Sequence, residues 1–366
     1  MKNWEVKKLG DVCSFFNGHA HEKCIDENGK YKLINSKFVS SEGENFKRTN
    51  NALSPLFVND IVMVMSDVPN GKTLAKCFVV DKDDTYTLNQ RICVIRSKNF
   101  DTRFLYYQLN RNKYLLSFDN GENQSNLRKD DILNCELFIP PLTEQQRIVA
   151  ILDDAFAKID KAKDNAEQNL KNAKELFESY LQGVFKNKGD DWEEKALGEI
   201  IDIKNGKNQQ AVLSDTGEYK IMGSAGNVMG YATDFICEAG TTIIGRKGNI
   251  SKPLYINERF WNVDTAFGFY PKNEEKIDKK FLYYLCLGID FKSMNRGTTI
   301  PSLVKSELQT IQIYLPISLK IQQTIVKKLD ALITETKKIE SIYEQKIKDL
   351  EELKKSVLQK AFSGGI

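Results

Sequence analysis

The stretch DWEEKALGEIIDIKNG at residues 191–206 repeats the opening of the chain, NWEVKKLGDVCSFFNG at 3–18. Seven of the sixteen positions are identical, among them the tryptophan, the Leu-Gly pair and the final Asn-Gly. The repeat continues downstream, because DTRFLYY at 101–107 recurs as DKKFLYY at 278–284. A period of about 180 residues is too long for a solenoid repeat, so each copy is expected to hold a whole domain.

A long helix is predicted at the end of each copy. In the first copy it starts within PPLTEQQRIVAILD at 140–153, where Thr143 and Gln146 have the spacing of a capping box. Apolar residues or alanine then recur in steps of four and three over 148–184, which is a heptad seam with one four-residue stutter. The second copy has PISLKIQQTIVKKLD at 316–330 and repeats the seam and its stutter. Each helix has about 40 residues and a length of about 60 Å.

The two helices are expected to pack on each other, because such a long seam cannot be buried on one small domain. The alternative is a solvated helix that packs only on its own domain. Since only a short connection separates the first helix from Trp192, the pair must run antiparallel, with a pseudo-twofold axis between the copies. This arrangement places Phe185 near Trp192 and Phe362 near Trp4.

The remaining segments are predicted to be globular domains of mixed α/β structure. Short β-branched runs between Gly, Asn and Pro read as buried strands, and two longer periodic runs read as helices that cover the sheet. The predicted strands are DIVMVM (60–65), RICVIR (91–96), TTIIG (241–245) and IQIYL (311–315), and the helical runs are FLYYQLNRNKYLL (104–116) and FLYYLCLGIDFKSM (281–294). The predicted fold class is α+β: two globular mixed α/β domains at 1–140 and 188–316, separated by a long antiparallel two-helix coiled coil formed by 141–187 and 317–366.

Composition limits the class of protein. The chain has 366 residues, a net charge of +3 and 41% hydrophobic residues, which is ordinary for a soluble protein. It has no apolar run long enough to span a bilayer, and the charged start does not match a signal peptide. Seven cysteines without a CxxC pair fit reduced thiols. We therefore expect a cytoplasmic protein without membrane contact, in which local patches or a partner supply the charge for any nucleic-acid binding.

The sequence contains no convincing catalytic constellation. SDVPNGKT at 66–73 ends like a phosphate-binding loop, but Ser66 stands where the first glycine is required. GHAHEKC at 18–24 holds both histidines of the chain and could bind a metal only with ligands from elsewhere, so no metal site is predicted. Glu5 and Lys7 resemble half of a magnesium-nuclease signature without its upstream aspartate. A nucleobase methyltransferase tetrad and a glycine-rich cofactor loop are both absent from the sequence.

Polar, basic, glycine-containing loops remain in both domains, and their side chains are of the types that contact base edges and phosphates. Solvation alone also explains polar loops, so each residue is an individual hypothesis. The predicted DNA-binding residues are His19, His21, Lys23, Asn70, Lys72, Thr73, Asn120, Asn123, Gln124, Lys207, Asn208, Gln209, Gln210, Ser224, Asn227, Arg246, Lys247, Asn249, Asn295 and Arg296.

Four stretches together resemble the specificity subunits of type I restriction-modification enzymes. These are IPPLTEQQRIVAILDDAFAKID with the helix after it, the restart DWEEKALGEI, and GRKGNISKPLYINERFWNVDTAF at 245–267. The resemblance implies that the globular domains are target recognition domains, each of which reads half of a split double-stranded DNA sequence. It also implies that the helices hold two methyltransferase subunits, which bind S-adenosylmethionine, and that motor-nuclease restriction subunits join the complex. The second copy departs from the pattern, because ISLKIQQ lacks the glutamate before Gln322.

The resemblance implies a chain without catalytic activity and without a cofactor of its own. The alternative from another class is a coiled-coil scaffold whose end domains bind proteins. Salt-dependent binding to duplex DNA separates these two hypotheses. A DNA reader neutralises backbone phosphates and therefore binds less tightly as salt rises, whereas a protein-binding scaffold does not bind the duplex.

Overall fold

The computed structural model describes residues 4–68, 71–97, 100–119, 121, 123–363 and 365. Contacts within the chain divide it into two compact units. Unit 1 comprises Met1–Asp164 and Lys348–Ile366, and unit 2 comprises Asn165–Ile347. Both long helices therefore contribute one part to each unit, so the compact units differ from the four segments predicted from the sequence.

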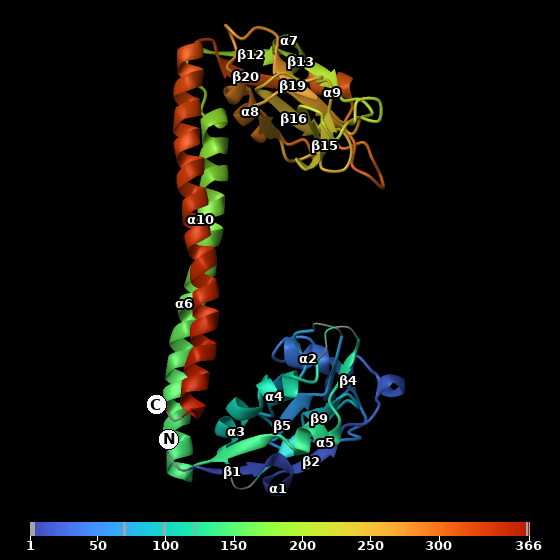
Figure 1. Ribbon diagram of the computed structural model, residues 1–366, viewed down its shortest axis with the longest axis vertical. Coiled ribbons are helices and arrows are strands. Elements are labelled where there is room, and N and C mark those ends of the chain that lie inside the picture. The colour runs from blue at the N-terminus through green and yellow to red at the C-terminus, as the bar shows by residue number, and fades with distance from the viewer. Residues whose placement is uncertain are drawn as a thin grey trace. The chain divides into compact units, whose positions relative to one another are not determined.

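Unit 1 is built on two small sheets and two strand pairs (Figure 1). A four-stranded antiparallel sheet has the order β2–β9–β5–β7, and a three-stranded sheet has the order β4–β3–β8, in which β3 and β8 are parallel. The strands are β1 (Glu5–Lys8), β2 (Ser14–Asn17), β3 (Tyr31–Ile34), β4 (Lys47–Thr49), β5 (Ile61–Val64), β6 (Ser66–Asp67), β7 (Cys77–Val79), β8 (Tyr86–Leu88), β9 (Ile92–Arg96), β10 (Ser125–Asn126) and β11 (Glu136–Ile139). The short helices are α1 (Leu9–Val12), the 3₁₀ turn η1 (Glu22–Cys24), α2 (Ser36–Ser40), α3 (Thr102–Leu109), α4 (Lys113–Leu116) and α5 (Lys129–Leu133).

Unit 2 repeats this plan. Its four-stranded sheet has the order β13–β19–β16–β17, and its three-stranded sheet β15–β14–β18 again contains one parallel pair, β14 with β18. The strands are β12 (Trp192–Ala196), β13 (Ile201–Asn205), β14 (Tyr219–Met222), β15 (Val228–Ala232), β16 (Thr241–Gly245), β17 (Leu254–Ile256), β18 (Phe260–Asn262), β19 (Ala266–Pro271) and β20 (Gln312–Pro316). The short helices are α7 (Leu197–Ile200), α8 (Lys279–Leu287) and α9 (Lys305–Gln309).

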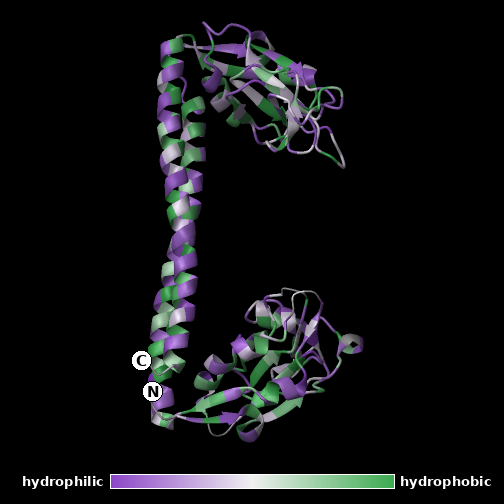
Figure 2. Ribbon diagram, in the orientation of Figure 1, coloured by the Kyte–Doolittle hydropathy of each residue, from purple (hydrophilic) through white to green (hydrophobic). Residues whose placement is uncertain are grey.

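Two long helices, α6 (Leu142–Lys186) and α10 (Leu319–Phe362), follow the two sheet regions. Hydrophobic residues recur along both among hydrophilic ones (Figure 2). In unit 1, Asp160 pairs with Lys354 and Lys163 pairs with Glu351. Residue numbers increase along α6 while those of the paired residues decrease along α10, so the two helices run antiparallel. In unit 2, the end of α6 packs against the beginning of α10 in one apolar cluster. These contacts confirm the predicted α+β class and the antiparallel helix pair.

The predicted seam positions are buried or half-buried, with two exceptions. Ile148, Leu152 and Leu329 are fully buried, because the seam also packs on the core of each unit. Two positions are wrong: Tyr180 is 41% exposed, beside the buried Leu181, and Ile339 is 37% exposed. Ala173 stays buried after the stutter, so the one-residue shift is confined to Tyr180 and Leu181.

The capping box predicted at Thr143 is also wrong. Helix α6 begins at Leu142, so Thr143 lies inside the first turn, and the amides of Glu144 and Gln145 bond to the carbonyl of Pro141 at 2.9 and 3.0 Å. At the start of the helix it is the Gln145 side chain that bonds to the backbone, since its Nε2 donates to the carbonyl of Pro140 at 2.9 Å.

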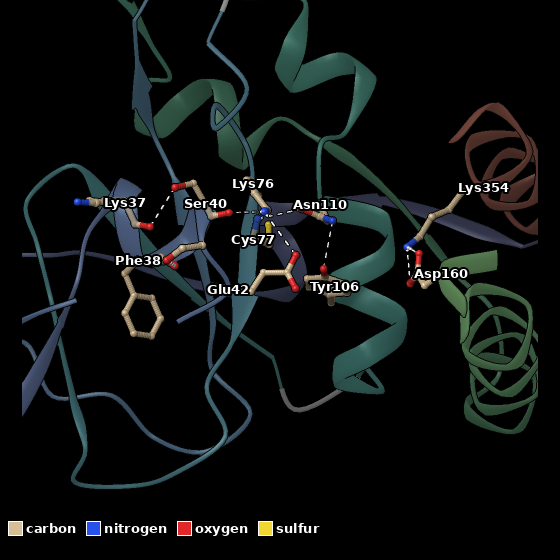
Figure 3. A network of polar contacts seen from close by, with 11 residues as sticks. Lys37, Phe38, Ser40, Glu42, Lys76, Cys77, Tyr106, Asn110, Asp160 and Lys354 are labelled. Atoms are coloured by element: carbon tan, nitrogen blue, oxygen red, sulfur yellow. Dashed lines mark hydrogen bonds and ion pairs between the residues drawn. The ribbon is translucent and has the colours of Figure 1, made fainter. Parts of the chain in front are cut away.

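The helical run predicted over 104–116 is interrupted. Helix α3 ends at Leu109 and α4 begins at Lys113, because Arg111 adopts a φ of 57° that no α-helix contains. Tertiary contacts hold this break: the Asn110 side chain accepts from the amide of Cys77 at 3.0 Å and donates to the Tyr106 hydroxyl at 3.2 Å (Figure 3). In unit 2 the equivalent helix α8 ends at Leu287, short of the predicted residue 294.

Candidate nucleic-acid interface

Equivalent polar contacts attach the sheet region of each unit to a long helix. In unit 1, Asp101 caps α3, and its backbone amide donates to Gln145 on α6. In unit 2, Asp278 caps α8, and its amide donates to Gln322 on α10. Both glutamines are about 99% buried, so these bonds are shielded from water. Each polar surface described below is therefore carried by a sheet region that is anchored to a helix.

Tyrosine–aspartate pairs provide a second attachment. Tyr107 on α3 donates to Asp153 on α6, and Tyr284 on α8 donates to Asp330 on α10 at 2.5 Å. Burial, followed by the hydrogen bond to Asp153, raises the pKa of Tyr107 to about 12. The tyrosines therefore stay protonated and donate at neutral pH.

The four predicted loops of unit 2 come together on one surface. Loop 245–249 lies beside loop 294–302, because the amide of Gly248 donates to the carbonyl of Pro301 at 2.8 Å and the amide of Leu303 donates to Arg246 at 2.9 Å. Loop 204–211 joins them through the turn after β18, since the amide of Lys207 donates to the carbonyl of Asn262 at 2.9 Å.

The turn at 263–266 is the common neighbour of these loops. The amides of Arg246 and Lys247 both donate to the carbonyl of Thr265, at 2.8 and 3.1 Å. The amide of Val263 donates to the carbonyl of Met222 at 3.3 Å, which places loop 223–227 on the same side. Backbone hydrogen bonds thus bring loops that are 89 positions apart in the sequence (207 to 296) together around one turn.

The predicted residues of unit 2 fall into two groups. Lys207, Asn208, Gln210, Asn227 and Lys247 are exposed, and Gln209, Ser224, Arg246 and Asn249 are half-buried. Asn295 and Arg296 are exposed but engaged within the domain. The side chain of Asn295 accepts from the amides of Gly297 and Ser302, both at 2.8 Å, and Arg296 pairs with Glu307 at 3.0 Å. Asn295 and Arg296 therefore shape their loop.

Unit 1 arranges its loops in an equivalent way. β6 of loop 66–73 pairs with β10 of loop 119–126, where unit 2 has the single bridge between Lys247 and Ser302. The amide of His19 donates to the carbonyl of Leu88 at 3.0 Å, as Lys207 does to Asn262 in unit 2.

Gly18 and Gly206 occupy the same position in the two copies. A Cβ at Gly18 would lie 2.2 Å from the carbonyl oxygen of Asn89, and one at Gly206 would lie 1.8 Å from that of Val263. The repeated Asn-Gly pair therefore marks a close backbone approach between the first loop and the turn that follows β8 or β18.

The predicted residues of unit 1 have different environments. His19, Lys23, Lys72, Asn123 and Gln124 are exposed, and Thr73 is half-buried. The side chain of Gln124 donates to Ser66 at 2.7 Å, so it also connects the two loops. Asn70 and Asn120 lie outside the described residues.

His21 must be removed from the predicted DNA-binding set. It is fully buried, and its ring nitrogens contact the carbonyl of His19 at 2.7 Å and the Thr87 hydroxyl at 3.1 Å. Alternate residues of an extended strand share a face, but His21 lies outside any strand, directly before the 3₁₀ turn η1, and only His19 is exposed. Within the described part of the chain, no group of three or more His, Cys, Asp or Glu side chains is placed to hold a metal ion.

Asp67 in loop 66–73 binds nearby backbone amides. The Asp67 carboxylate accepts from the amides of Val68, Thr73 and Leu74 at 2.9, 2.7 and 3.1 Å. Burial alone would raise the pKa of Asp67, but these hydrogen bonds outweigh it, and the pKa lies below its ordinary value. These three amides are therefore already bonded to a carboxylate.

A hollow of about 570 Å³ lies beside loop 17–23 in unit 1. Its wall includes the exposed rings of Phe16 and Phe57, and the Arg96 guanidinium lies between them, 5.5 and 4.9 Å from the ring centres. The buried Asp60 carboxylate accepts from Arg96 at 2.6 and 2.7 Å, which neutralises its charge. Most of the residues that line the hollow are apolar, and Lys129 also lines it.

Two central turns were not among the residues predicted from the sequence. Gln90 and Arg91 in unit 1, and Asp264 and Thr265 in unit 2, occupy the middle of turns that the predicted loops surround. The only sequence signal is a short polar interruption between two buried strands, which is common in any sheet protein. Their position among the loops depends on the parallel pairing of β8 with β3 and of β18 with β14.

A family model and a similar protein of known class both indicate the same family. A family model for the type I restriction modification DNA specificity domain matches residues 1–172 and 189–350, one range in each copy of the repeat. The type I restriction enzyme MjaVIII specificity subunit of Methanocaldococcus jannaschii is 24% identical to this chain, over 97% of this chain and 90% of that protein. Among the described residues, no helix is long and apolar enough to cross a membrane.

Two solved structures have a similar fold. One, described as "Structural basis underlying complex assembly and conformational transition of the type I R-M system", superposes with a TM-score of 0.84 at 18% identity, and covers 100% of this chain and 99% of its own. The HsdS subunit from Thermoanaerobacter tengcongensis superposes with a TM-score of 0.62 at 17% identity, and covers 100% and 98%.

Proposed function

Because this chain belongs to the family of type I restriction modification DNA specificity domains and is a specificity subunit, we propose that unit 1 reads one half of a bipartite DNA target and unit 2 reads the other. The observation that carries the proposal is the equivalent assembly of loops in both units. Loops that differ in sequence surround the same turn of the same sheet framework, which suits two readers of different half-sites.

The long helices are proposed to set the unread gap between the half-sites. α6 has 45 residues and α10 has 44, so the two copies provide helices of nearly equal length. The buried glutamines and the tyrosine–aspartate pairs support this role, because a helix can fix a spacing only if each reading surface is held firmly to it.

We further propose that the helices dock two methyltransferase subunits, and that motor-nuclease restriction subunits join that assembly. Leu176 on α6 and Leu353 on α10 occupy the same position of the repeat and are 52% and 47% exposed. A repeated apolar side chain on a surface helix suits a partner that binds once to each copy.

The chain is proposed to have no turnover of its own, with S-adenosylmethionine bound by the methyltransferase subunits. The purified chain, incubated with labelled S-adenosylmethionine and target duplex, should transfer no methyl groups. Adding the methyltransferase subunit should start transfer to the same duplex, and transfer by the chain alone would contradict this part of the proposal.

Lys247 provides the test of DNA binding. It is exposed on the surface where four loops of unit 2 meet, so Lys247→Ala should weaken duplex binding and reduce the slope of log K against log salt by about 1. The matched control is Lys276→Ala, an exposed lysine beyond the other end of β19. Titrations of the full chain, with and without its methyltransferase partner, measure both slopes. Absence of salt-dependent duplex binding by the unmodified protein would favour the protein-binding scaffold.

A further inference from the structure

The two central turns are the best-positioned elements for base recognition. The turn at 89–92 follows β8 and precedes β9, and the turn at 263–266 follows β18 and precedes β19. Both are closed by the same backbone hydrogen bond, from the amide of Ile92 to Asn89 at 3.0 Å and from the amide of Ala266 to Val263 at 3.1 Å. The two copies therefore present one structural element with two different sequences.

Neighbouring loops hold each turn from both sides through its backbone. In unit 1 the amide of Gly18 donates to the carbonyl of Ile92, and the amide of Met65 donates to the carbonyl of Arg91, both at 3.0 Å. In unit 2 Gly206 donates to Ala266 at 3.1 Å, and Arg246 donates to Thr265 at 2.8 Å. Because these bonds fix the backbone, the positions from which the middle side chains project are set before any ligand binds.

The middle side chains differ in chemistry. Gln90, Arg91 and Asp264 are exposed, and Thr265 is half-buried. Glutamine makes paired hydrogen bonds to adenine and arginine makes them to guanine, whereas aspartate accepts from the amino group of cytosine. A carboxylate is repelled by phosphates, so Asp264, which lies in a turn bordered by Lys207, Arg246 and Lys247, suits contact with a base edge.

We propose that these turns are the specificity-determining elements of the two units, an inference that rests on the proposed function. Gln90 and Arg91 read an adenine and a guanine in the half-site of unit 1. Asp264 reads a cytosine through its amino group in the half-site of unit 2, with Thr265 beside it. The surrounding lysines and arginines supply affinity that is independent of sequence.

The experiment selects duplexes with randomised half-sites against the full chain in its complex with the methyltransferase subunits. Asp264→Asn should change the base preference at one position of one half-site by a factor between about 5 and about 150. The other half-site and the salt slope should stay unchanged. Gln90→Ala with Arg91→Ala should relax adjacent positions of the opposite half-site. The matched control, Glu275→Gln, replaces an exposed carboxylate beyond the other end of β19 and should select the unmodified motif.

Each outcome separates this inference from the proposed function. If the unmodified complex selects no bipartite motif, the proposed function fails. If it selects a motif that Asp264→Asn and the Gln90/Arg91 variant leave unchanged, only the assignment of the turns fails. A uniform loss of binding to all duplexes, without a change of motif, would also overturn the assignment, because a structural or phosphate-contacting residue produces that result.

Discussion

Gln145 on α6 accepts a hydrogen bond from the backbone amide of Asp101, the residue that caps α3, at a distance of 2.9 Å. Its Nε2 donates to the carbonyl of Pro140 at 2.9 Å, so one buried side chain satisfies two backbone groups from different elements. Gln322 makes the same pair of bonds in unit 2, to Asp278 and Pro316, at 2.9 and 3.0 Å. One glutamine in each copy thus connects a long helix to a sheet region.

Gln145→Leu should lower the free energy of unfolding by about 2–4 kcal/mol, because it leaves two buried backbone groups without partners. Gln322→Leu should have a similar effect. Urea unfolding followed by tryptophan fluorescence measures the loss. The matched controls are Gln146→Leu and Gln323→Leu, whose side chains are exposed, and these should change stability little. Equal losses at adjacent glutamines would contradict the anchoring role.

Leu176→Glu and Leu353→Glu should each remove one methyltransferase subunit from the complex, and the double variant should remove both. A charge placed at the centre of an apolar contact is not paired and weakens the association. Light scattering on the purified complex gives the stoichiometry. Ile342→Glu is the control, since Ile342 is 54% exposed but its equivalent in α6 is Asn165. A double variant that still binds two subunits would exclude this surface as the docking site.

Seven residues inserted into both long helices should lengthen the preferred gap. The insertion points are between Asp164 and Asn165 in α6 and between Ile347 and Lys348 in α10, where both helices pass from one unit to the other. One heptad keeps the seam in phase and adds about 10 Å, which corresponds to about three base pairs and a third of a turn of duplex.

Competition between duplexes that differ only in gap length measures this effect. The half-sites should stay the same, because the loops are unchanged. The control replaces the seven residues before each insertion point with the inserted sequence, without a change in length, and should keep the original gap. If the lengthened protein also keeps the original gap, the helices do not determine the spacing.

Asp67→Asn should destabilise the protein at neutral pH and much less in acid. The hydrogen bonds to its carboxylate lower the pKa of Asp67 in the folded state, so its contribution is present above the ordinary value of 3.8 and is lost as the pH falls. We expect a loss of about 1–2 kcal/mol at pH 7 that shrinks below about pH 4. Urea unfolding at several pH values provides the measurement, with Asp11→Asn, an exposed carboxylate in α1, as the control. A loss that does not depend on pH would mean that the negative charge is not required.

The helices and the duplication could be predicted from the sequence because both signals are long. The seam extends over 148–184 and recurs 177 residues later. Because it depends only on the local spacing of apolar residues, it can be recognised without knowledge of tertiary contacts. The break after Leu109 could not be predicted, because Asn110 and Arg111 carry no glycine or proline signal. Its cause is tertiary: the amide of Arg111 donates to the carbonyl of Ala75 at 2.8 Å.

The candidate interface was predicted only in part, for a related reason. Polar loops are visible in the sequence, but their assembly depends on which strands pair. The burial of His21 and the central positions of Arg91 and Asp264 follow from the parallel pairs β3–β8 and β14–β18, whose partners are far apart in the sequence. Residue type likewise could not distinguish the roles of Asn295 and Lys247. The Asn295 side chain bonds to the backbone of its own loop, whereas Lys247 lies in the adjacent loop.

The division of both long helices between the units has a consequence for synthesis on the ribosome. Unit 2 is continuous in sequence, so it has all of its core residues once residue 347 has emerged. The core of unit 1 includes Ala361 and packs against Phe362, which are translated more than 350 residues after Trp4. The part translated first is therefore completed last, and the apolar surface that Ala361 and Phe362 cover stays exposed until the second helix has been translated.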